Sequence, residues 1–194
     1  DVRPVGTRIY LLPVETRVPL KFGTEVLTSV TCVRVSLTVC DRQGRTAVGW
    51  GETPLSVQWV WPGKADYAVR YRALVELIER LASAWSTLGE YGHPIELWTR
   101  FEADVLSGVL EAANAARPEQ EQIPWLAALL CCASFDIALH DAFGCLHGIS
   151  CWQSYRVPYL SADLASLMGS DADEHVRFRK RYPGDYLIRP RTAS

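Results

Sequence analysis

The sequence has little excess charge of either sign: 20 Lys and Arg against 22 Asp and Glu give a net charge of −2. Proteins that bind nucleic acid neutralise phosphates with a basic surface, so this balance argues against a nucleic-acid partner. No uninterrupted apolar run reaches the roughly 18 residues that a membrane span needs, and no basic-then-apolar leader opens the chain. We therefore expect a soluble, cytoplasmic protein with neither a nucleic-acid nor a membrane partner.

Common catalytic motifs are missing as well. The chain has no Gly-rich phosphate loop, no Gly-x-Ser-x-Gly elbow and no His-Glu-x-x-His pair. Its 194 residues, 48% of them hydrophobic, are nevertheless enough for one globular domain of ordinary size plus a fragment. The sequence thus predicts a globular protein without a self-sufficient active site.

Six cysteines are an even number, which raises the possibility of disulfides. Cys32 and Cys40 lie on one predicted strand, about 26 Å apart at about 3.3 Å per residue, so they cannot bond to each other. Cys131 and Cys132 are neighbours in an apolar stretch. Because a chain of this length can bury a core without covalent links, we expect reduced, buried thiols in a reducing compartment.

The first fifty residues predict three antiparallel strands. Residues 26–41 alternate apolar and polar side chains, which is typical of a half-buried strand. The turn Asp41–Arg45, whose glycine takes a left-handed conformation, joins this strand to another over residues 46–52. The earlier run 8–18 is a further strand, and Pro13 within it favours an edge position or a bulge.

After Gly63 the apolar period changes to that of a helix. The pattern predicts helices over residues 66–89 behind an Asp66 cap, over 94–117 from Pro94, and over 124–143, the last ended by Gly144 or Gly148. Beyond Trp152 we expect a strand at 157–160, a helix at 171–181 and a strand at 185–188. Three strands followed by a bundle of three or more helices form an α+β fold.

Cys132, Asp136 and His140 share one face of the third predicted helix and suggest a catalytic triad. Eight residues at 1.5 Å each separate Cys132 from His140 by about 12 Å, which is too far for a hydrogen bond. A contact between Asp136 and His140 within one turn remains, and it satisfies two polar groups in a crowded helix.

Two further groups of residues have both a functional and a structural interpretation. Cys145, His147 and Cys151 are possible zinc ligands, but their spacing is unusual and a fourth ligand would have to come from elsewhere. Cysteines at the end of a buried helix are the plainer interpretation. Trp59 and Trp61 lie in a predicted loop that is either tucked under the first helix or faces a ligand or partner as a lid.

The hairpin ending Gly49-Trp50-Gly51-Glu52 precedes three helices, and the third carries Ser-Phe-Asp-Ile-Ala-Leu-His-Asp-Ala-Phe-Gly over residues 134–144, followed by Gly148. Over residues 5–155 this arrangement resembles the N-terminal capping domain of the enolase superfamily, in its mandelate racemase/muconate lactonizing enzyme branch. The resemblance implies a capping domain at residues 1–155 and an incomplete start of a (β/α) barrel at 156–194.

In that family the barrel carries the chemistry. Its carboxylates hold Mg²⁺, Lys or His bases remove the proton α to a carboxylate, and the metal stabilises the enediolate. The resemblance implies that two cap loops, 19–24 and 51–55, select and desolvate a small-molecule carboxylate or acid sugar without reacting. The substrate-binding residues that it implies are Lys21, Phe22, Thr24, Thr53 and Leu55, with Lys21 meeting an anionic group.

The sequence departs from the family pattern downstream of the third helix. Ser150–Tyr155 replaces a common Leu-Leu-Gly-Gly string, and Arg189-Pro190-Arg191 stands where the family often has a catalytic Lys-x-Lys. Arginine cannot act as a base at neutral pH, so we assign no catalytic residue to this chain. Fewer than 40 residues follow Tyr155, against about 250 in a barrel, so we expect the Mg²⁺ ligands outside this chain.

These observations lead to two hypotheses. The first is the capping domain of a Mg²⁺-dependent racemase, dehydratase or cycloisomerase, which is inactive without its barrel and forms a homo-oligomer. The second is a non-catalytic association module of the same α+β fold, with the Trp59–Trp61 segment as a contact surface. The mass of the natural protein separates them, because a barrel requires about 40 kDa or more per chain and the module requires 21.7 kDa.

Overall fold

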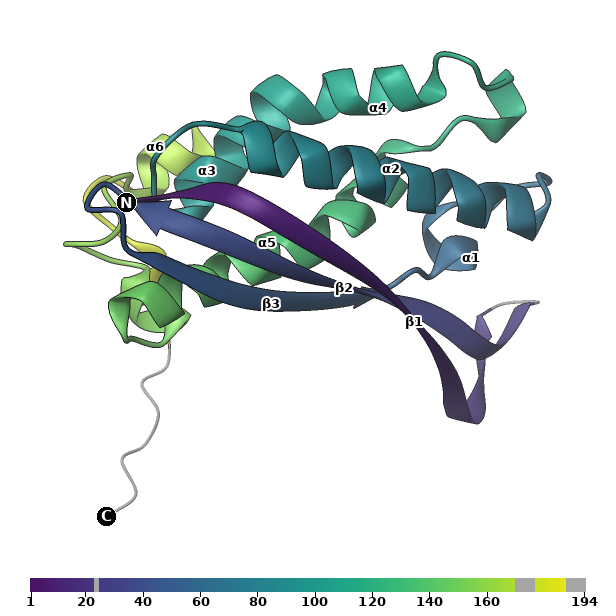
Figure 1. The fold of residues 1–194 in the computed structure, drawn as a ribbon, viewed down its shortest axis with the longest axis horizontal. Coiled ribbons are helices and arrows are strands. Elements are labelled where there is room, and N and C mark those ends of the chain that lie inside the picture. The colour runs from purple at the N-terminus through teal and green to yellow at the C-terminus, as the bar shows by residue number, and fades with distance from the viewer. Residues whose placement is uncertain (23–24, 170–176, 188–194) are drawn as a thin grey trace.

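The computed structural model describes residues 1–22, 25–169 and 177–187, in which helices cover one face of a sheet (Figure 1). The sheet has the order β1-β2-β3, with every neighbouring pair antiparallel. Its strands are β1 (Val2–Phe22), β2 (Glu25–Asp41) and β3 (Thr46–Pro54). The predicted α+β fold with a three-stranded antiparallel sheet is confirmed, although β1 is much longer than the predicted 8–18.

The β2–β3 turn forms as its residues predict. The Asp41 side chain accepts hydrogen bonds from the backbone N–H groups of Gln43 and Arg45, at 2.9 and 2.8 Å. Gly44 has a φ of +80°, which a residue with a side chain rarely adopts. These interactions fix the register in which β3 returns along β2.

Pro13 lies on an edge strand, as predicted. It pairs with Thr31, whose carbonyl accepts a hydrogen bond of 2.8 Å from the N–H of Leu55, beyond the end of β3. Because the N–H and C=O of one residue point to the same side of an antiparallel ladder, Pro13 directs its missing donor to the free edge of β1. Proline therefore costs this sheet no hydrogen bond.

The first long helix matches its prediction. Helix α2 (Tyr67–Thr87) begins after Asp66, whose side chain accepts a hydrogen bond of 2.7 Å from the N–H of Ala68. Its apolar stripe packs on the inner face of the sheet, and the hydroxyl of Thr7 on β1 donates to the carbonyl of Ala82. The chain leaves the helix at Gly89, with a φ of +74°.

The second predicted helix is one continuous run with an irregular centre. It consists of α3 (Pro94–Phe101), a π-helical turn (Glu102–Leu106) and α4 (Ser107–Asn114). The predicted start at Pro94 is confirmed, whereas nothing in the sequence indicated the wider turn. A single-turn 3₁₀ helix (Glu119–Glu121) then leads to the third helix.

Helix α5 (Trp125–His147) runs through the centre of the fold, and Gly148 ends it with a φ of +65°. Of the two predicted glycines, Gly144 therefore lies inside the helix. The stretch Glu119–His147 is long and apolar enough to cross a membrane by length and composition. Half of its most apolar window is buried within the fold, as is usual for a core helix.

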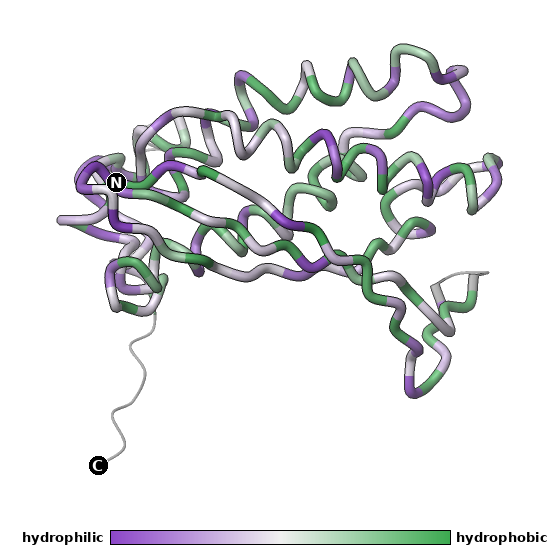
Figure 2. Tube along the Cα trace, in the orientation of Figure 1, coloured by the Kyte–Doolittle hydropathy of each residue, from purple (hydrophilic) through white to green (hydrophobic). Residues whose placement is uncertain are grey.

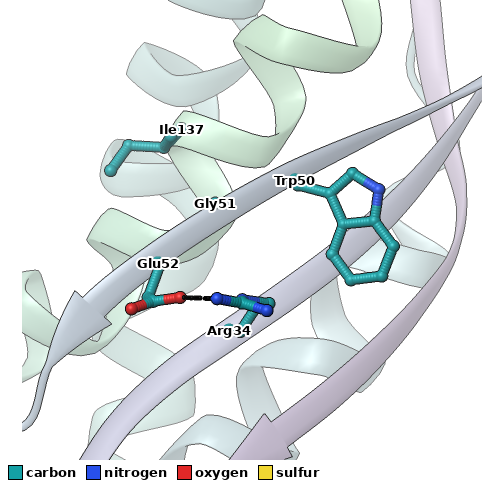
Figure 3. A pocket seen from close by; sticks show the side chains of 5 residues that line it. All are labelled: Arg34, Trp50, Gly51, Glu52 and Ile137. Carbon is teal, nitrogen blue, oxygen red and sulfur yellow. Dashed lines mark hydrogen bonds and ion pairs between the residues drawn. The ribbon is translucent and has the colours of Figure 1, made fainter.

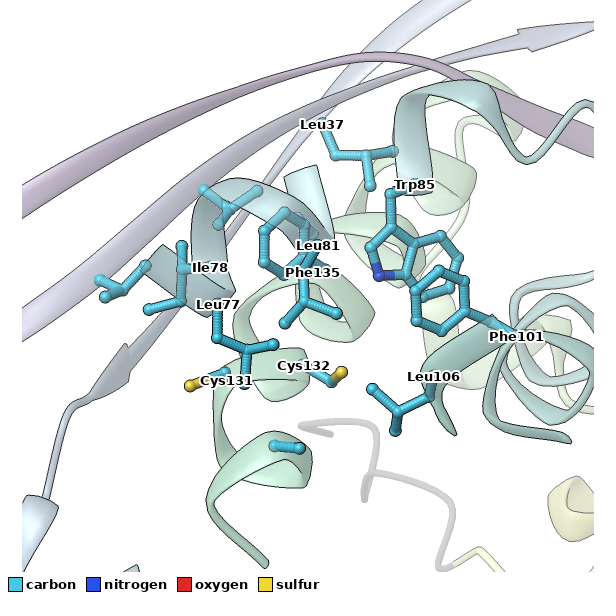
Figure 4. Close-up of a cluster of buried hydrophobic side chains, with 14 of the residues drawn as sticks. Leu37, Leu77, Ile78, Leu81, Trp85, Phe101, Leu106, Cys131, Cys132 and Phe135 are labelled. Atoms are coloured by element: carbon cyan, nitrogen blue, oxygen red, sulfur yellow. The ribbon is translucent and has the colours of Figure 1, made fainter. Parts of the chain in front are cut away.

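The core lies between the sheet and the helices α2, α3 and α5 (Figure 4). Trp85 of α2 stacks on Phe101 of α3 with ring centroids 4.0 Å apart, and both side chains are fully buried. Phe135 of α5 and Leu37 of β2 close this cluster from the other two sides. Every long element thus contributes its apolar face to one core.

The region after α5 differs from its prediction. It contains the 3₁₀ turns Cys151–Ser154 and Pro183–Asp185 and the short helix α6 (Leu164–Met168), which the sequence analysis missed. Residues 157–160 form a turn closed by bonds to the carbonyl of Arg156, and 185–187 form no strand. Both strand predictions are wrong, because a short apolar run becomes a strand only where a neighbouring strand can pair with it.

The predicted helix over residues 171–181 lies partly outside the described residues, and its described part, 177–181, is not helical. No described segment after residue 155 therefore forms a barrel strand. The division of the chain into a cap at residues 1–155 and a barrel start at 156–194 stays a prediction.

Candidate functional site

The Gly-Trp-Gly-Glu end of the hairpin is a contact between a strand and a helix. A Cβ on Gly49 would lie 2.1 Å from the backbone nitrogen of Ala142, and one on Gly51 would lie 2.1 Å from the carbonyl oxygen of Ser134. Neither distance is possible for real atoms, so only glycine lets β3 approach the backbone of α5 this closely. Small residues on α5, including Ala138, complete the contact.

A hydrogen bond fixes the same junction. The carboxylate of Asp141 on α5 accepts a bond of 2.8 Å from the backbone N–H of Trp50. This N–H lies on the edge of the sheet and has no strand to donate to. The glycines and the Asp-Ile-Ala-Leu-x-Asp run on which the sequence resemblance is based therefore have a structural function: they attach α5 to β3.

The two predicted substrate loops do not meet. Lys21 pairs across the hairpin with Val26, whereas Thr53 pairs with Val33. The two partners on β2, Val26 and Val33, are seven residues apart, which corresponds to about 23 Å at about 3.3 Å per residue. The loops therefore lie at different points along the same strand.

The five candidate residues also differ in accessibility. Lys21 is exposed and Thr53 is almost covered, while Leu55 is only 1% exposed and belongs to the core. Phe22 pairs its backbone with that of Glu25, and Thr24 lies outside the described residues. Among the candidates whose side chains the structure describes, Lys21 offers an exposed surface to a ligand, whereas Leu55 anchors the end of β3.

The paired ends of β1 and β2 continue beyond the end of β3, bend away from the helices and form what we call the arm, residues 13–22 and 25–30 (Figure 1). Figure 2 shows many apolar residues along it. Val18, Leu20 and Val26 are 64%, 45% and 54% exposed, respectively. The arm is therefore an apolar extension without a packing partner among the described residues.

The segment of the two predicted tryptophans is a short helix rather than a loop. Helix α1 (Val57–Val60) follows Leu55, and Trp61 after it is buried under α2, where its carbonyl accepts a hydrogen bond from the Arg70 guanidinium. Trp59 is 57% exposed. Trp61 thus fits the interpretation of a segment tucked under the first helix. Trp59 is accessible, as the interpretation of a segment facing a ligand or partner requires.

A depression of about 400 Å³ lies beside the edge strand β3, at the start of the predicted substrate loop 51–55. It is lined by Arg34, Trp50, Gly51, Glu52 and Ile137 (Figure 3). Gly51 and Glu52 belong to that predicted loop, and the period-2 pattern places Arg34 on the face of the sheet away from the core.

The side chains of the buried histidines form structural hydrogen bonds and do not activate a nucleophile. His93 is fully buried, and its Nδ1 accepts the N–H of Ile95 while its Nε2 lies 3.0 Å from the Ser154 hydroxyl. Burial, with the nearby His140, lowers the pKa of His93 to about 4. His93 is therefore neutral near pH 7, with Nε2–H donating to Ser154.

The predicted contact between Asp136 and His140 is confirmed: His140 Nδ1 lies 2.9 Å from the Asp136 carbonyl and 3.4 Å from its carboxylate. Burial lowers the pKa of His140, but the hydrogen bond and charge of Asp136 outweigh it and leave the pKa raised. Burial raises the pKa of Cys131 to about 12. Burial also raises the pKa of Cys132. Both thiols are protonated and unreactive at neutral pH.

All six cysteines are free, but they are not uniformly buried as predicted, because Cys145 is exposed. Within residues 1–22, 25–169 and 177–187, no group of three His, Cys, Asp or Glu side chains is placed to hold a metal ion. Mg²⁺ requires several oxygen ligands in an octahedral arrangement. The described residues therefore do not fit the Mg²⁺ site that the family resemblance implies.

No protein-family model and no curated protein matches the sequence. Solved structures of the enolase superfamily are similar to it. A mandelate racemase/muconate lactonizing enzyme-like protein from Rubrobacter xylanophilus is 21% identical with a TM-score of 0.42, over 83% of this chain and 35% of that one. The L-Ala-D/L-Glu epimerase from Bacillus subtilis is 18% identical with a TM-score of 0.40, over 79% and 35% of the two chains.

A third similar structure is the L-talarate/galactarate dehydratase from Salmonella typhimurium LT2, 18% identical with a TM-score of 0.41, over 78% of this chain and 32% of that one. The chain spans about a third of the length of each of these proteins. They come from the superfamily that the sequence resembles.

Proposed function

We propose that residues 1–155 act as the substrate-capping domain of a Mg²⁺-dependent enzyme of the enolase type, whose barrel removes the proton α to a carboxylate. The arm is the observation that carries the proposal. It bends away from the helices with exposed apolar side chains, and an isolated two-stranded hairpin is only marginally stable in water. Such an arm is suited to close upon another surface, as a lid over a substrate does.

In this proposal the chain contributes binding and exclusion of water, while the barrel supplies the bases and the Mg²⁺. Lys21 is exposed on the arm, where its ammonium can pair with an anionic group of a carboxylate or acid-sugar substrate. Phe22 and Thr24, from the same predicted loop, would contact the substrate together with Lys21, whereas Thr53, whose partner on β2 lies seven residues from that of Lys21, would be too far away to contact the same small molecule. Closure of the arm would strengthen these interactions by removing water.

Leu55 has a different role in the proposal. Its side chain is in the core and its N–H donates to the Thr31 carbonyl, so it holds the end of β3 in place rather than contacting the substrate. Since six free cysteines suit a reducing compartment, the proposed location is the cytoplasm. We also propose that the protein is a homo-oligomer.

The direct test is α-proton exchange in D₂O. The 194-residue chain, incubated with Mg²⁺ and a panel of α-hydroxy acids and sugar acids, should incorporate no α-deuterium above background. The natural protein should have a mass of about 40 kDa or more per chain and should catalyse the exchange. Exchange by the 194-residue chain alone would contradict the division of labour between cap and barrel.

A matched pair of variants tests the role of the arm in the natural protein. Lys21→Ala should raise KM for an anionic substrate about tenfold, because it removes a charged partner. Arg17→Ala removes another exposed cation from the same arm and should leave KM within about twofold. Equal effects of the two substitutions would show that the arm contributes only general positive charge.

The alternative is a stand-alone association module of the same fold. The face of the sheet away from the helices supports it, because this face exposes Trp50, Tyr10 and Val48 with nothing packed on them among the described residues. A natural protein of 21.7 kDa without exchange activity would favour this alternative.

A further inference from the structure

The outer face of the sheet carries a compact group of large side chains. Tyr10, Arg34 and Glu52 lie side by side on β1, β2 and β3, and Trp50 and Val48 follow on β3. These five residues form what we call the outer-face patch. Their side chains point away from the helices, because the neighbouring residues of β2 and β3 face the core.

The composition of the patch is that of a protein contact. Trp50, Val48 and Tyr10 are 49%, 45% and 40% exposed, and the Trp50 and Tyr10 rings are 5.9 Å apart at an angle of 33°. Trp, Tyr and Arg are the residues in which binding energy concentrates at protein interfaces. The depression beside Trp50, bordered by Ile137 of α5, offers space for a side chain of a partner.

The charges of the patch match a second copy of the same chain. Arg34 and Glu52 are 2.7 Å apart, with side chains 49% and 38% exposed. A two-fold axis through the patch would place Arg34 of one copy next to Glu52 of the other and would repeat that contact symmetrically. A patch of a single sign would repel its own copy, whereas a patch that carries both signs can pair with its copy.

The size of the face is also suitable. Three strands about 4.8 Å apart, each nine residues long at about 3.4 Å per residue, cover an area of about 440 Å². A standard interface buries about 800 Å² on each partner. The sheet face therefore provides the centre of an interface, and Ile137 on one side and the arm on the other lie where its rim would be.

We propose that two copies of this chain associate through the outer-face patch, with a two-fold axis close to Trp50. This proposal rests on the homo-oligomer proposed above and names its surface. The two sheets face each other, Trp50 and Tyr10 form the apolar centre, and Arg34 and Glu52 pair across the axis.

A matched pair of tryptophan variants tests the surface. Sedimentation equilibrium of the 194-residue chain should show a dimer, and Trp50→Ala should weaken it at least about 30-fold, as expected for a residue that dominates an interface. Trp59→Ala removes a tryptophan that is 57% exposed on α1 and should leave the dimer unchanged. Both side chains are surface groups, and circular dichroism of each variant checks that it remains folded.

Charge reversal tests the geometry. Arg34→Glu and Glu52→Arg should each give a monomer, because each variant brings like charges together across the axis. An equimolar mixture of the two variants should form a heterodimer, because opposite charges then meet between chains. Mixing the two variants cannot restore the ion pair between Arg34 and Glu52 within one chain, so a heterodimer would show that the two residues pair between chains. A mixture that stays monomeric overturns the proposed contact.

Failure of this proposal can be distinguished from failure of the proposed function. A chain that stays monomeric at about 100 μM overturns both the homo-oligomer and its surface, whereas the exchange experiment tests the capping role separately. A dimer weakened by Trp59→Ala but not by Trp50→Ala overturns the surface alone.

Discussion

The two ends of the sheet are built from the same strands but are held in different ways. At one end Val2 exchanges two backbone hydrogen bonds of 3.0 Å with Gly92, and helices α2 and α5 cover the inner face. At the other end the described residues of the arm are joined by the ladder between β1 and β2 and by hydrogen bonds from the Thr16 hydroxyl to the carbonyls of Leu27 and Thr28. Hydrogen bonds alone contribute little net stability, so the buried side chains decide which end of the sheet is rigid.

The largest expected effect concerns the junction in the well-packed half. Gly51→Ala should lower the free energy of unfolding by about 3 kcal/mol, because the new methyl group meets a backbone carbonyl that cannot move independently of α5. Gly6→Ala on β1 is the matched control, since a Cβ there has no atom within 4 Å, and it should change stability by less than about 0.5 kcal/mol. Urea denaturation of both variants measures the difference.

The next effect is the response of the packed end to acid. The pKa of His93 in the folded protein is about 4, below the value of about 6.5 expected when unfolded. The unfolded state therefore binds a proton first, and stability should fall between pH 6.5 and 4, by up to about 3 kcal/mol. The pKa of His147 is also lowered, so it adds to the loss in the same direction.

His93→Asn should reduce this acid dependence, because an asparagine amide can still cap α3 but does not titrate. His140 acts in the opposite direction and at higher pH: its raised pKa gives stability that is lost as pH rises through that pKa. Urea denaturation at several pH values between 4.5 and 8 separates the two. If the free energy of unfolding of His93→Asn falls with decreasing pH as steeply as that of the parent protein, groups other than His93 cause the fall.

A smaller, more local effect is expected where the chain after α5 is attached. One carboxylate oxygen of Glu96 accepts the N–H groups of Ser161 and Ala162, and the other accepts the N–H of His93. Glu96→Ala should cost about 1–3 kcal/mol and should accelerate amide hydrogen exchange at residues 161–162. Glu111→Ala, an exposed position on α4, should do neither.

The smallest effect is expected in the arm. Val18→Ala should change the free energy of unfolding by less than about 0.5 kcal/mol, because the side chain is 64% exposed and loses little contact. Amides of residues 13–22 should also exchange faster than those of residues 32–40 on the same sheet. A loss above about 1 kcal/mol would mean that the arm packs on another surface in solution.

Local patterns predicted most of the elements up to the end of α5. The alternation in β2, the Asp66 cap and the proline that opens α3 each act on neighbouring residues, so the sequence alone contains the information. The π-helical turn at Glu102–Leu106 was missed because it depends on how that helix packs. The strand predicted at 157–160 was wrong because no strand pairs with it.

Less of the candidate site could be predicted. Lys21 was expected in a loop but lies near the end of β1, and Leu55 belongs to the core because the chain turns inward after β3. The outer-face patch combines residues from three strands, and the register between the strands decides which of these residues lie next to one another. No single segment of the sequence shows that these residues are adjacent.

The sequence by itself determined the order and type of the long strands and helices, because periods of 2 and 3.6 residues are properties of neighbours along the chain. Only the tertiary structure decided why Gly49 and Gly51 are glycines, since the atoms that would clash with a Cβ belong to α5, more than eighty residues away. It also decided that one end of the sheet is buried and the other exposed, because burial depends on which elements meet.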